Sequence, residues 1–255
     1  MDHAQAQSQD LFDVLVVGAG PAGLMAAEQA ARAGIRVAVA EAMPSPARKF
    51  LMAGKSGLNL TKAEDPDAFL QHFDAIAPLK PILSEFGPAE VIGFAEGLGQ
   101  KVFTGSTGRV FPTRMKASPL LRAWLARLDA LGVVLLRRHR WIGPLTTDAP
   151  HLLATPKGQV AVTAGALILA LGGASWARLG SDGAWQTPVA AAGVPIVPIQ
   201  ASNVGLQRAW SDHMRPFFGQ PVKNIELTVA DQRSRGEFVI TQSGVEGGAI
   251  YALGR

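Results

Sequence analysis

Apolar runs and a small-residue segment follow one another near the N-terminus in the order that a parallel sheet requires. Residues 11–17 (LFDVLVV) are almost wholly apolar, which is typical of a central strand buried on both faces. A glycine-rich turn follows, and the Ala-rich stretch 21–33 then predicts a helix that ends at Gly34. Residues 35–40 (IRVAVA) predict a second strand, which leads to Glu41. The pattern therefore predicts a βαβ unit with short connections.

The middle of the chain predicts a loop, several helices and a hairpin. Residues 42–62 contain Pro, Gly, Lys and Asn and predict a long loop, a feature that is often functional inside a compact domain. Residues 66–100 have a helical pattern interrupted by prolines, and residues 101–112 carry turn signals typical of a hairpin. Residues 118–131 predict an amphipathic helix with Ser118 as its N-cap.

Shorter strands dominate the remainder of the chain. Residues 133–163 give short apolar runs separated by Gly, Pro and Asp, as in an antiparallel meander, and residues 166–171 (ALILAL) predict a buried strand. The proline-rich segment 188–198 indicates a crossing between domains. Beyond it, short strands are expected again, for example at residues 225–229 and 236–240.

These patterns together predict an α/β fold class and two domains. We expect a disordered polar tail over residues 1–10. Residues 11–200 are expected to form a Rossmann-like domain with a parallel sheet and an antiparallel β-meander. Residues 201–255 are expected to be β-rich.

Composition narrows the class of protein. Hydrophobic residues make up 48% of the 255 residues and charged residues 17%, which excludes a disordered chain. The absence of cysteine excludes disulfides, cysteine-ligated metal centres and a redox-active dithiol, and it fits the cytoplasm, where we expect the protein. The longest apolar stretch, residues 164–171, is too short to span a membrane, so no membrane partner is expected.

Positive charge is scattered along the chain, which has a net charge of +4 and a pI of about 9.7. The densest run is RRHR at residues 137–140, which follows the apolar residues 133–136 and is expected to extend the same strand as a solvated end. Because no nucleic-acid-binding motif accompanies it, no nucleic acid partner is expected, and RNA binding stays a lesser alternative. The histidines show no metal-ligand spacing, so no metal site is expected.

The strongest chemical signal is a G-x-G-x-x-G loop between the first strand and the first helix. Gly18 permits the tight turn, Gly20 lets a pyrophosphate approach the backbone, and Gly23 allows close helix–strand packing. Glu41 follows about 20 residues later, where an acid accepts hydrogen bonds from ribose hydroxyls and disfavours a 2′-phosphate. A purely structural glycine turn is the alternative. The candidate cofactor residues of this unit are Gly18, Gly20, Pro21, Ala22, Gly23 and Glu41.

A second candidate segment follows the acid. Residues 48–61 (RKFLMAGKSGLNLT) combine basic, glycine, hydroxyl and amide residues, which suit the wrapping of a dinucleotide and the donation of N–H groups to a flavin edge. Its Gly-Lys-Ser triplet is not a P-loop, because Phe50 occupies the place of the first glycine. A solvated basic loop is the alternative. The candidate cofactor residues here are Arg48, Lys49, Gly54 and Asn59.

Five segments of the chain resemble one family, the HI0933/YhiN-type flavoproteins, also called BaiN-like NAD(P)/FAD-dependent oxidoreductases. The resemblance runs from about residue 11 to the last residue. One departure is that many members have Gly-Arg-Cys-Asn where this chain has SGLN at residues 56–59, so the chain is similar to a cysteine-free branch. The resembling segments are VVGAGPAGLMAA (16–27), RKFLMAGKSGLNLT (48–61), GRVFPTRMKASPLLRAWL (108–125), ALILALGGASWARLGSDGAW (166–185) and GVEGGAIYAL (244–253).

The resemblance implies FAD bound in extended form. Gly172 and Gly173 match glycines that lie beside the cofactor, and Trp141 matches a position whose backbone meets the adenine; for Trp141 a packing role is an equal alternative. Lys49 and Asn59 fall in the block near the flavin. Lys116 either faces the active site or leads into the following helix.

The implied function is an FAD-dependent oxidoreductase that passes hydride from NAD(P)H through FAD to a small unsaturated or carbonyl substrate. No catalytic residue is assigned. The resemblance also implies an FAD-binding domain without its C-terminal return segment and, over residues 201–255, the beginning of an inserted β-rich domain. Weak or absent flavin binding is therefore expected. The alternatives are a truncated dinucleotide-binding module without turnover and a flavin monooxygenase or oxidase.

Overall fold

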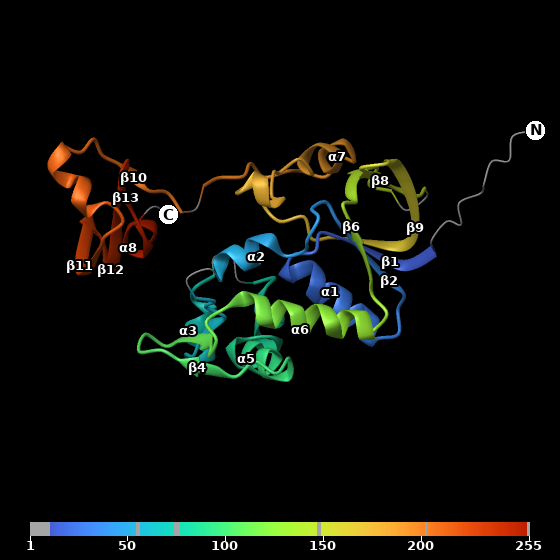
Figure 1. Cartoon of the computed structure of the whole chain (residues 1–255), viewed down its shortest axis with the longest axis horizontal. Coiled ribbons are helices and arrows are strands. Elements are labelled where there is room, and N and C mark those ends of the chain that lie inside the picture. The colour runs from blue at the N-terminus through green and yellow to red at the C-terminus, as the bar shows by residue number, and fades with distance from the viewer. Residues whose placement is uncertain (1–10, 55–56, 74–76, 147–148, 202, 254–255) are drawn as a thin grey trace, which may run out of the picture. The chain divides into compact units, whose positions relative to one another are not determined.

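The computed structural model describes residues 11–54, 57–73, 77–146, 149–201 and 203–253 (Figure 1). The chain divides into two compact units, Met1–Ile196 and Val197–Arg255. The polar tail expected at residues 1–10 lies outside the described residues.

A six-stranded mixed sheet forms the centre of the first unit, in the order β6-β2-β1-β9-β8-β7. The first four strands in this order run parallel, as the Rossmann prediction requires, and the last three, which share β9 with them, are antiparallel. The strands are β1 (Leu11–Val17), β2 (Val37–Glu41), β6 (Val134–Arg137), β7 (Arg140–Gly143), β8 (His151–Thr155) and β9 (Gly158–Leu169).

Strand β9 belongs to both halves of this sheet. Its first residues pair antiparallel with β8, from Gly158 opposite Thr155 to Val162 opposite His151. Its later residues pair parallel with β1 as far as Leu169, opposite Val17. The end of the predicted meander and the strand predicted at residues 166–171 are therefore parts of one long strand, β9. The sequence pattern had predicted them as separate strands.

Helices cover both faces of the sheet. Helices α1 (Pro21–Arg32) and α6 (Ala117–Ala130) lie side by side against one face, and α7 (Gln186–Ala191) packs beside β7 on the other side (Figure 1). The remaining helices of the unit are α2 (Arg48–Ala53), α3 (Pro66–Leu70), α4 (Lys80–Glu85), α5 (Pro88–Gly97) and the 3₁₀ turn η1 (Ala177–Leu179). The hairpin expected at residues 101–112 is present as β4 (Val102–Thr104) and β5 (Arg109–Pro112), which pairs with β3 (Thr61–Lys62).

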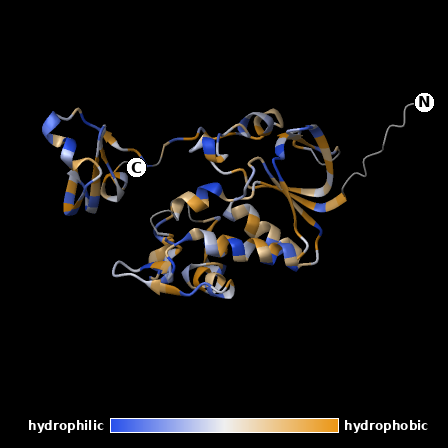
Figure 2. Cartoon of the chain, viewed as in Figure 1, coloured by the Kyte–Doolittle hydropathy of each residue, from blue (hydrophilic) through white to orange (hydrophobic). Residues whose placement is uncertain are grey.

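Two apolar clusters lie on opposite faces of the sheet because successive side chains of a strand point to opposite sides. Val14 and Val16 face α1 and α6, whereas Leu15 and Val17 face Trp141 and the meander. The central strands are hydrophobic along most of their length (Figure 2). Burial on both faces explains why the sequence of β1 is a continuous apolar run and shows no alternation.

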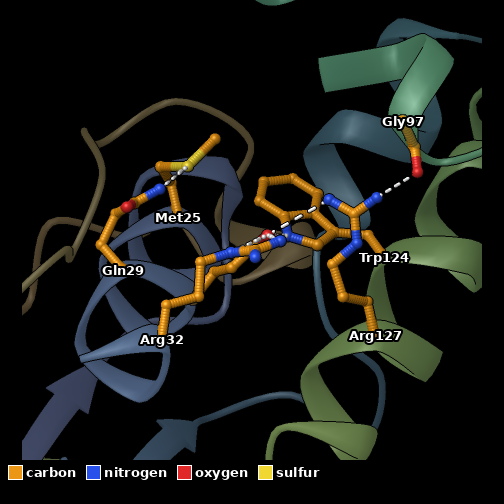
Figure 3. A network of polar contacts seen from close by, with 7 residues as sticks. Met25, Gln29, Arg32, Gly97, Trp124 and Arg127 are labelled. Carbon is orange, nitrogen blue, oxygen red and sulfur yellow. Dashed lines mark hydrogen bonds and ion pairs between the residues drawn. The ribbon is translucent and has the colours of Figure 1, made fainter. Parts of the chain in front are cut away.

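A buried carboxylate joins helices α1 and α6. The Glu28 side chain, only 2% exposed, accepts hydrogen bonds from Arg32 of its own helix (2.7 Å), from the Trp124 indole N–H (2.7 Å) and from Arg127 (3.2 Å) (Figure 3). Arg127 also donates to the carbonyl oxygen of Gly97, at the end of α5. Burial alone would raise the pKa of Glu28, but these donors outweigh it and hold the pKa below its ordinary value.

Two local predictions about helices were wrong. Residues 42–62 are not one loop, since α2 forms within them: Phe50 and Leu51 pack on the core beside α6, and this burial favours a helix. Helix α6 begins at Ala117 with Lys116 in the N-cap position, so Ser118 lies inside the first turn and caps nothing.

The basic run at residues 137–140 does not extend one strand. Arg138 has a positive φ of 60°, and this left-handed residue ends β6 and starts β7 in a new direction. The bend is held because the Arg138 N–H donates to the carbonyl oxygen of Met43 and the His139 N–H to that of Glu41. Because β6 is parallel to β2, it also belongs to the parallel sheet and not to the meander.

The second unit is an antiparallel sheet in the order β10-β13-β12-β11, with helix α8 (Gly248–Tyr251) packed against it. The expected strands at residues 225–229 and 236–240 lie within β11 and β12. Its strands are β10 (Leu206–Gln207), β11 (Pro221–Val229), β12 (Gln232–Thr241) and β13 (Gly244–Glu246); a 3₁₀ helix, η2 (Asp212–Phe217), precedes β11.

Candidate functional site

A cavity of about 430 Å³ opens at the carboxyl ends of β1, β2 and β9. Ligands bind at this edge of open parallel sheets, because the loops that follow the strands meet there. The cavity is lined by the fingerprint loop, by the end of β2, by the start of α2, by β7 and by residues 179–188 after β9. It therefore brings together segments that are far apart in the sequence.

The three fingerprint glycines have different surroundings. Gly18 has a φ of +104°, and a Cβ there would lie 2.3 Å from the carbonyl oxygen of Ala170. A Cβ on Gly23 would lie 1.8 Å from the carbonyl oxygen of Gly18, so the start of α1 packs directly on the loop. A Cβ on Gly20 would meet no protein atom within 4 Å. Gly18 and Gly23 are thus required by the fold, whereas the open side of Gly20 faces the space that a ligand would fill.

Glu41 lines the cavity at the end of β2 and is already hydrogen-bonded to the backbone. Its Oε2 accepts from the Ala19 N–H at 3.0 Å, and its Oε1 accepts from the Met43 N–H at 2.8 Å. Because a carboxylate has about four acceptor positions, these two bonds orient Glu41 and leave capacity for the hydroxyl groups of a ribose.

Two cations of α2 stand at the cavity without a carboxylate partner. The Lys49 ammonium donates to the hydroxyls of Ser175 (3.0 Å) and Ser181 (3.4 Å), and Ser181 in turn donates to the carbonyl oxygen of Gly173 (2.8 Å). Arg48 is half-buried and forms no hydrogen bond or ion pair with any residue that the structure describes. The two cations make this end of the cavity positive.

A third cation is neutralised within the protein. Arg140 at the start of β7 forms an ion pair of 2.9 Å with Asp182. Partial burial alone would raise the pKa of Asp182, but the Ala184 N–H and the Arg140 guanidinium hold it below its ordinary value. Because Asp182 pairs with Arg140, and no carboxylate of a described residue pairs with Arg48 or Lys49, the positive charge of these two residues remains available to an anionic ligand.

Two tryptophans supply unused donors at the same cavity. Trp141 of β7 is 6% exposed, Trp185 is half-buried, and both line the cavity. Within the described part of the chain, neither buried indole N–H has a hydrogen-bond partner. An unpaired buried donor costs free energy, so the two indoles are unsatisfied polar groups in the wall of the cavity.

The structure gathers many of the sequence-predicted residues around this cavity and leaves others outside it. Gly54 packs on α6, where a Cβ would lie 2.5 Å from that of Ala117, and Asn59 is exposed. The predicted residues that line the cavity are Gly18, Gly20, Pro21, Glu41, Arg48, Lys49, Trp141 and Gly172. Those that do not line it are Ala22, Gly23, Gly54, Asn59 and Gly173.

Several cavity residues were not singled out from the sequence: His139, Arg140, Ser181, Asp182 and Trp185. A signal for the last three was available, because residues 174–185 directly follow the glycines at the end of β9, where loops of parallel sheets form sites. His139 and Arg140 had been assigned to a solvated strand end.

The described residues contain neither a membrane-spanning helix nor a metal-binding cluster. No helix found there is long and apolar enough to cross a membrane. Within the same described ranges, no group of three or more His, Cys, Asp or Glu residues is arranged to hold a metal ion.

Solved structures match the fold of this chain. The open conformation of a flavocytochrome c3 fumarate reductase matches with a TM-score of 0.61 and 18% identity, over 84% of this chain and 47% of that one. E. coli quinol fumarate reductase FrdA, in a mutant form, matches with a TM-score of 0.51 and 18% identity, over 64% and 33%. The chain thus spans less than half the length of either protein.

Sequence comparison gives the family. No curated protein matches the chain. The family model described as the HI0933-like protein Rossmann domain matches residues 12–251, nearly the whole chain. The family expected from the five resembling segments is thus confirmed, and the chain belongs to the HI0933-like family.

Proposed function

We propose that this chain is the FAD-binding part of an FAD-dependent oxidoreductase and that the cavity holds the adenosine diphosphate half of FAD. The observation that carries the proposal is the open side of Gly20, the N-cap of α1, which follows the residue whose N–H donates to Glu41. A ligand phosphate on this side would meet the first N–H groups of α1, which no side chain caps.

The cavity residues fit each part of that ligand. Arg48 and Lys49 would balance the two negative charges of a diphosphate, and Glu41 would accept from the ribose hydroxyls. Trp141 and Trp185, which line the cavity, would supply aromatic surface to the adenine. FAD, when bound, supplies the capacity to accept and pass on hydride, and the chain's residues bind and orient it.

For the complete reaction, we propose NAD(P)H as the hydride donor and a small unsaturated or carbonyl compound as the acceptor. The resemblance of residues 48–61 and 166–185 to the family supports this assignment. The names of the two fold neighbours, both fumarate reductases, are consistent with reduction of an unsaturated compound. The chain's own contribution to the reaction is the placement of the cofactor.

The test is a calorimetric titration of the purified 255-residue chain with ADP, FAD and AMP. We expect ADP and FAD to bind with similar, weak affinity, because the cavity contacts only the half that they share, and AMP to bind more weakly still for lack of the second phosphate. Gly20→Ala should weaken ADP binding about tenfold, corresponding to about 1.4 kcal/mol. Gly93→Ala is the matched control, since its Cβ would also meet no atom.

Three outcomes separate the proposal from its alternatives. Absence of ADP binding, or equal binding by Gly20→Ala, would contradict it. Bound FAD that NADPH and NADH both fail to reduce would favour a dinucleotide-binding module without turnover. Reduction followed by rapid oxygen consumption would favour a monooxygenase or oxidase.

A further inference from the structure

A second cavity of about 490 Å³ adjoins the first one. The two cavities share Arg48 and Leu179 in their linings. The second is formed by α2 on one side and by the start of α6 on the other, where Lys116 and Ser118 line it. Its volume lies in the range of small-molecule sites.

The polar side chains of this second cavity favour an anion. Arg48 and Lys116 are its charged residues, and Ser45 and Ser118 add two hydroxyls. Among the described residues that line it, none carries a carboxylate. A ligand with negatively charged oxygens would therefore meet donors and no repelling charge.

Arg48 strengthens this interpretation because it is half-buried without a partner among the described residues. Removing a guanidinium partly from water costs free energy unless an anion or acceptor compensates for it. Its planar fork matches the two oxygens of a carboxylate or phosphate. From the border between the cavities, Arg48 reaches both.

The remaining surface of the second cavity is apolar. Leu51, Met52 and Leu179 line it, and Met52 is 38% exposed, more than is usual for a side chain of this kind. These side chains suit a hydrocarbon body attached to the anionic group. A free inorganic ion would leave this surface uncovered.

We propose that the second cavity binds a small molecule that joins an apolar body to an oxyanion, and that this molecule is the hydride acceptor of the proposed reaction. As an assignment of substrate, the inference rests on the proposed function; as a binding site, it stands on the second cavity alone. Carboxylates and phosphate monoesters share the chemistry that Arg48 and Lys116 recognise.

The probes are octanoate, octyl phosphate and octanol, titrated calorimetrically into the full chain with and without saturating ADP. We expect at least one octyl anion to bind together with ADP, and octanol to bind at least tenfold more weakly. The stronger of the two anions identifies the carboxylate or phosphate class. Inorganic phosphate binding as tightly as the octyl anions would overturn the apolar part of the proposal.

Variants locate the site. Lys116→Met should weaken the octyl anion at least tenfold and leave ADP affinity unchanged, whereas Lys101→Met, at an exposed lysine outside both cavities, should change neither. Met52→Glu, at an exposed position, should abolish anion binding by repulsion and provides a second test should Lys116→Met fold poorly.

The outcomes distinguish the two proposals. If the wild-type chain does not bind ADP, the proposed function is contradicted. Competition between ADP and the octyl anions, or an unchanged anion affinity in both Lys116→Met and Met52→Glu, would overturn the second site alone.

Discussion

The Oε2 atom of Glu41 accepts a hydrogen bond from the Ala19 N–H over 3.0 Å, and so the end of β2 is fastened to the fingerprint loop. Glu41 thereby shapes the loop before any ligand is present. Its other oxygen is held in the same way by the Met43 N–H. The residue that the sequence assigned to a ribose is also a structural support of the loop.

Glu41→Gln should therefore affect both stability and binding. The amide nitrogen of Gln cannot accept, so one of the two backbone N–H groups loses its partner, at a cost of about 1–3 kcal/mol in the free energy of unfolding. ADP affinity should fall as well. Urea unfolding and calorimetry measure the two effects, with the exposed Glu96→Gln as the control. Unchanged values in both measurements would refute the dual role of Glu41.

Glycine substitutions should separate folding from binding. Gly23→Ala places a methyl group 1.8 Å from the carbonyl oxygen of Gly18, so α1 must shift. The free energy of unfolding should therefore fall by about 2 kcal/mol or more. Gly20→Ala meets no protein atom and should retain the wild-type unfolding curve. Thermal unfolding monitored by circular dichroism compares the two variants. Equal melting temperatures would contradict the close packing at Gly23 and the open space at Gly20.

The buried carboxylate between α1 and α6 should be the most sensitive charged position of the first unit. Glu28→Gln leaves Arg32 and Arg127 without their anion, and removal of one partner from a buried charge network costs about 3 kcal/mol. Urea unfolding of Glu28→Gln and of the surface variant Glu96→Gln gives the comparison. A difference below about 0.5 kcal/mol would show that solvent screens the network.

The Glu28 carboxylate should also make the stability of the protein depend on pH. Because the pKa of Glu28 is lowered on folding, its contribution is complete above the ordinary value of about 4.5 and is lost as the pH falls through the lower folded pKa. The difference in unfolding free energy between wild type and Glu28→Gln should therefore shrink below pH 4.5. Carboxylates common to both proteins cancel in this difference, and a gap that widens in acid would contradict the sign.

His151 should produce a separate pH dependence at milder acidity. Burial lowers the pKa of His151, and the hydrogen bond with the Pro144 carbonyl offsets this only in part. The unfolded chain therefore takes up the proton first, and stability should fall as the pH drops below about 6.5. At pH 7.5, His151→Leu should be less stable than wild type. Between pH 7.5 and pH 5.5, however, its free energy of unfolding should fall by less than that of wild type. Urea unfolding at the two pH values measures both differences.

Local signals in the sequence were sufficient for the βαβ unit, because turns, helix ends and strand burial depend on neighbouring residues. The position of Gly18, Gly20 and Glu41 at one cavity could be expected from their spacing alone. The bond from Lys49 to Ser175 could not, since it joins α2 to a loop more than 100 residues away. Helix α2 was missed for the same reason: its stability comes from packing on α6, which no local pattern of residues 48–53 reveals.

Strand β9 connects two parts of the molecule mechanically. Its antiparallel half is set by the hairpin with β8, and its parallel half ends at Leu169, just before the cavity residue Gly172. A slip of one residue in the hairpin would turn every following side chain of β9 to the opposite face and move the loop that carries Ser181 and Asp182. The outer hairpin, far from β1 in the sequence, thus sets the alignment of the first cavity, and an insertion in the hairpin should weaken the binding of ADP that we propose there.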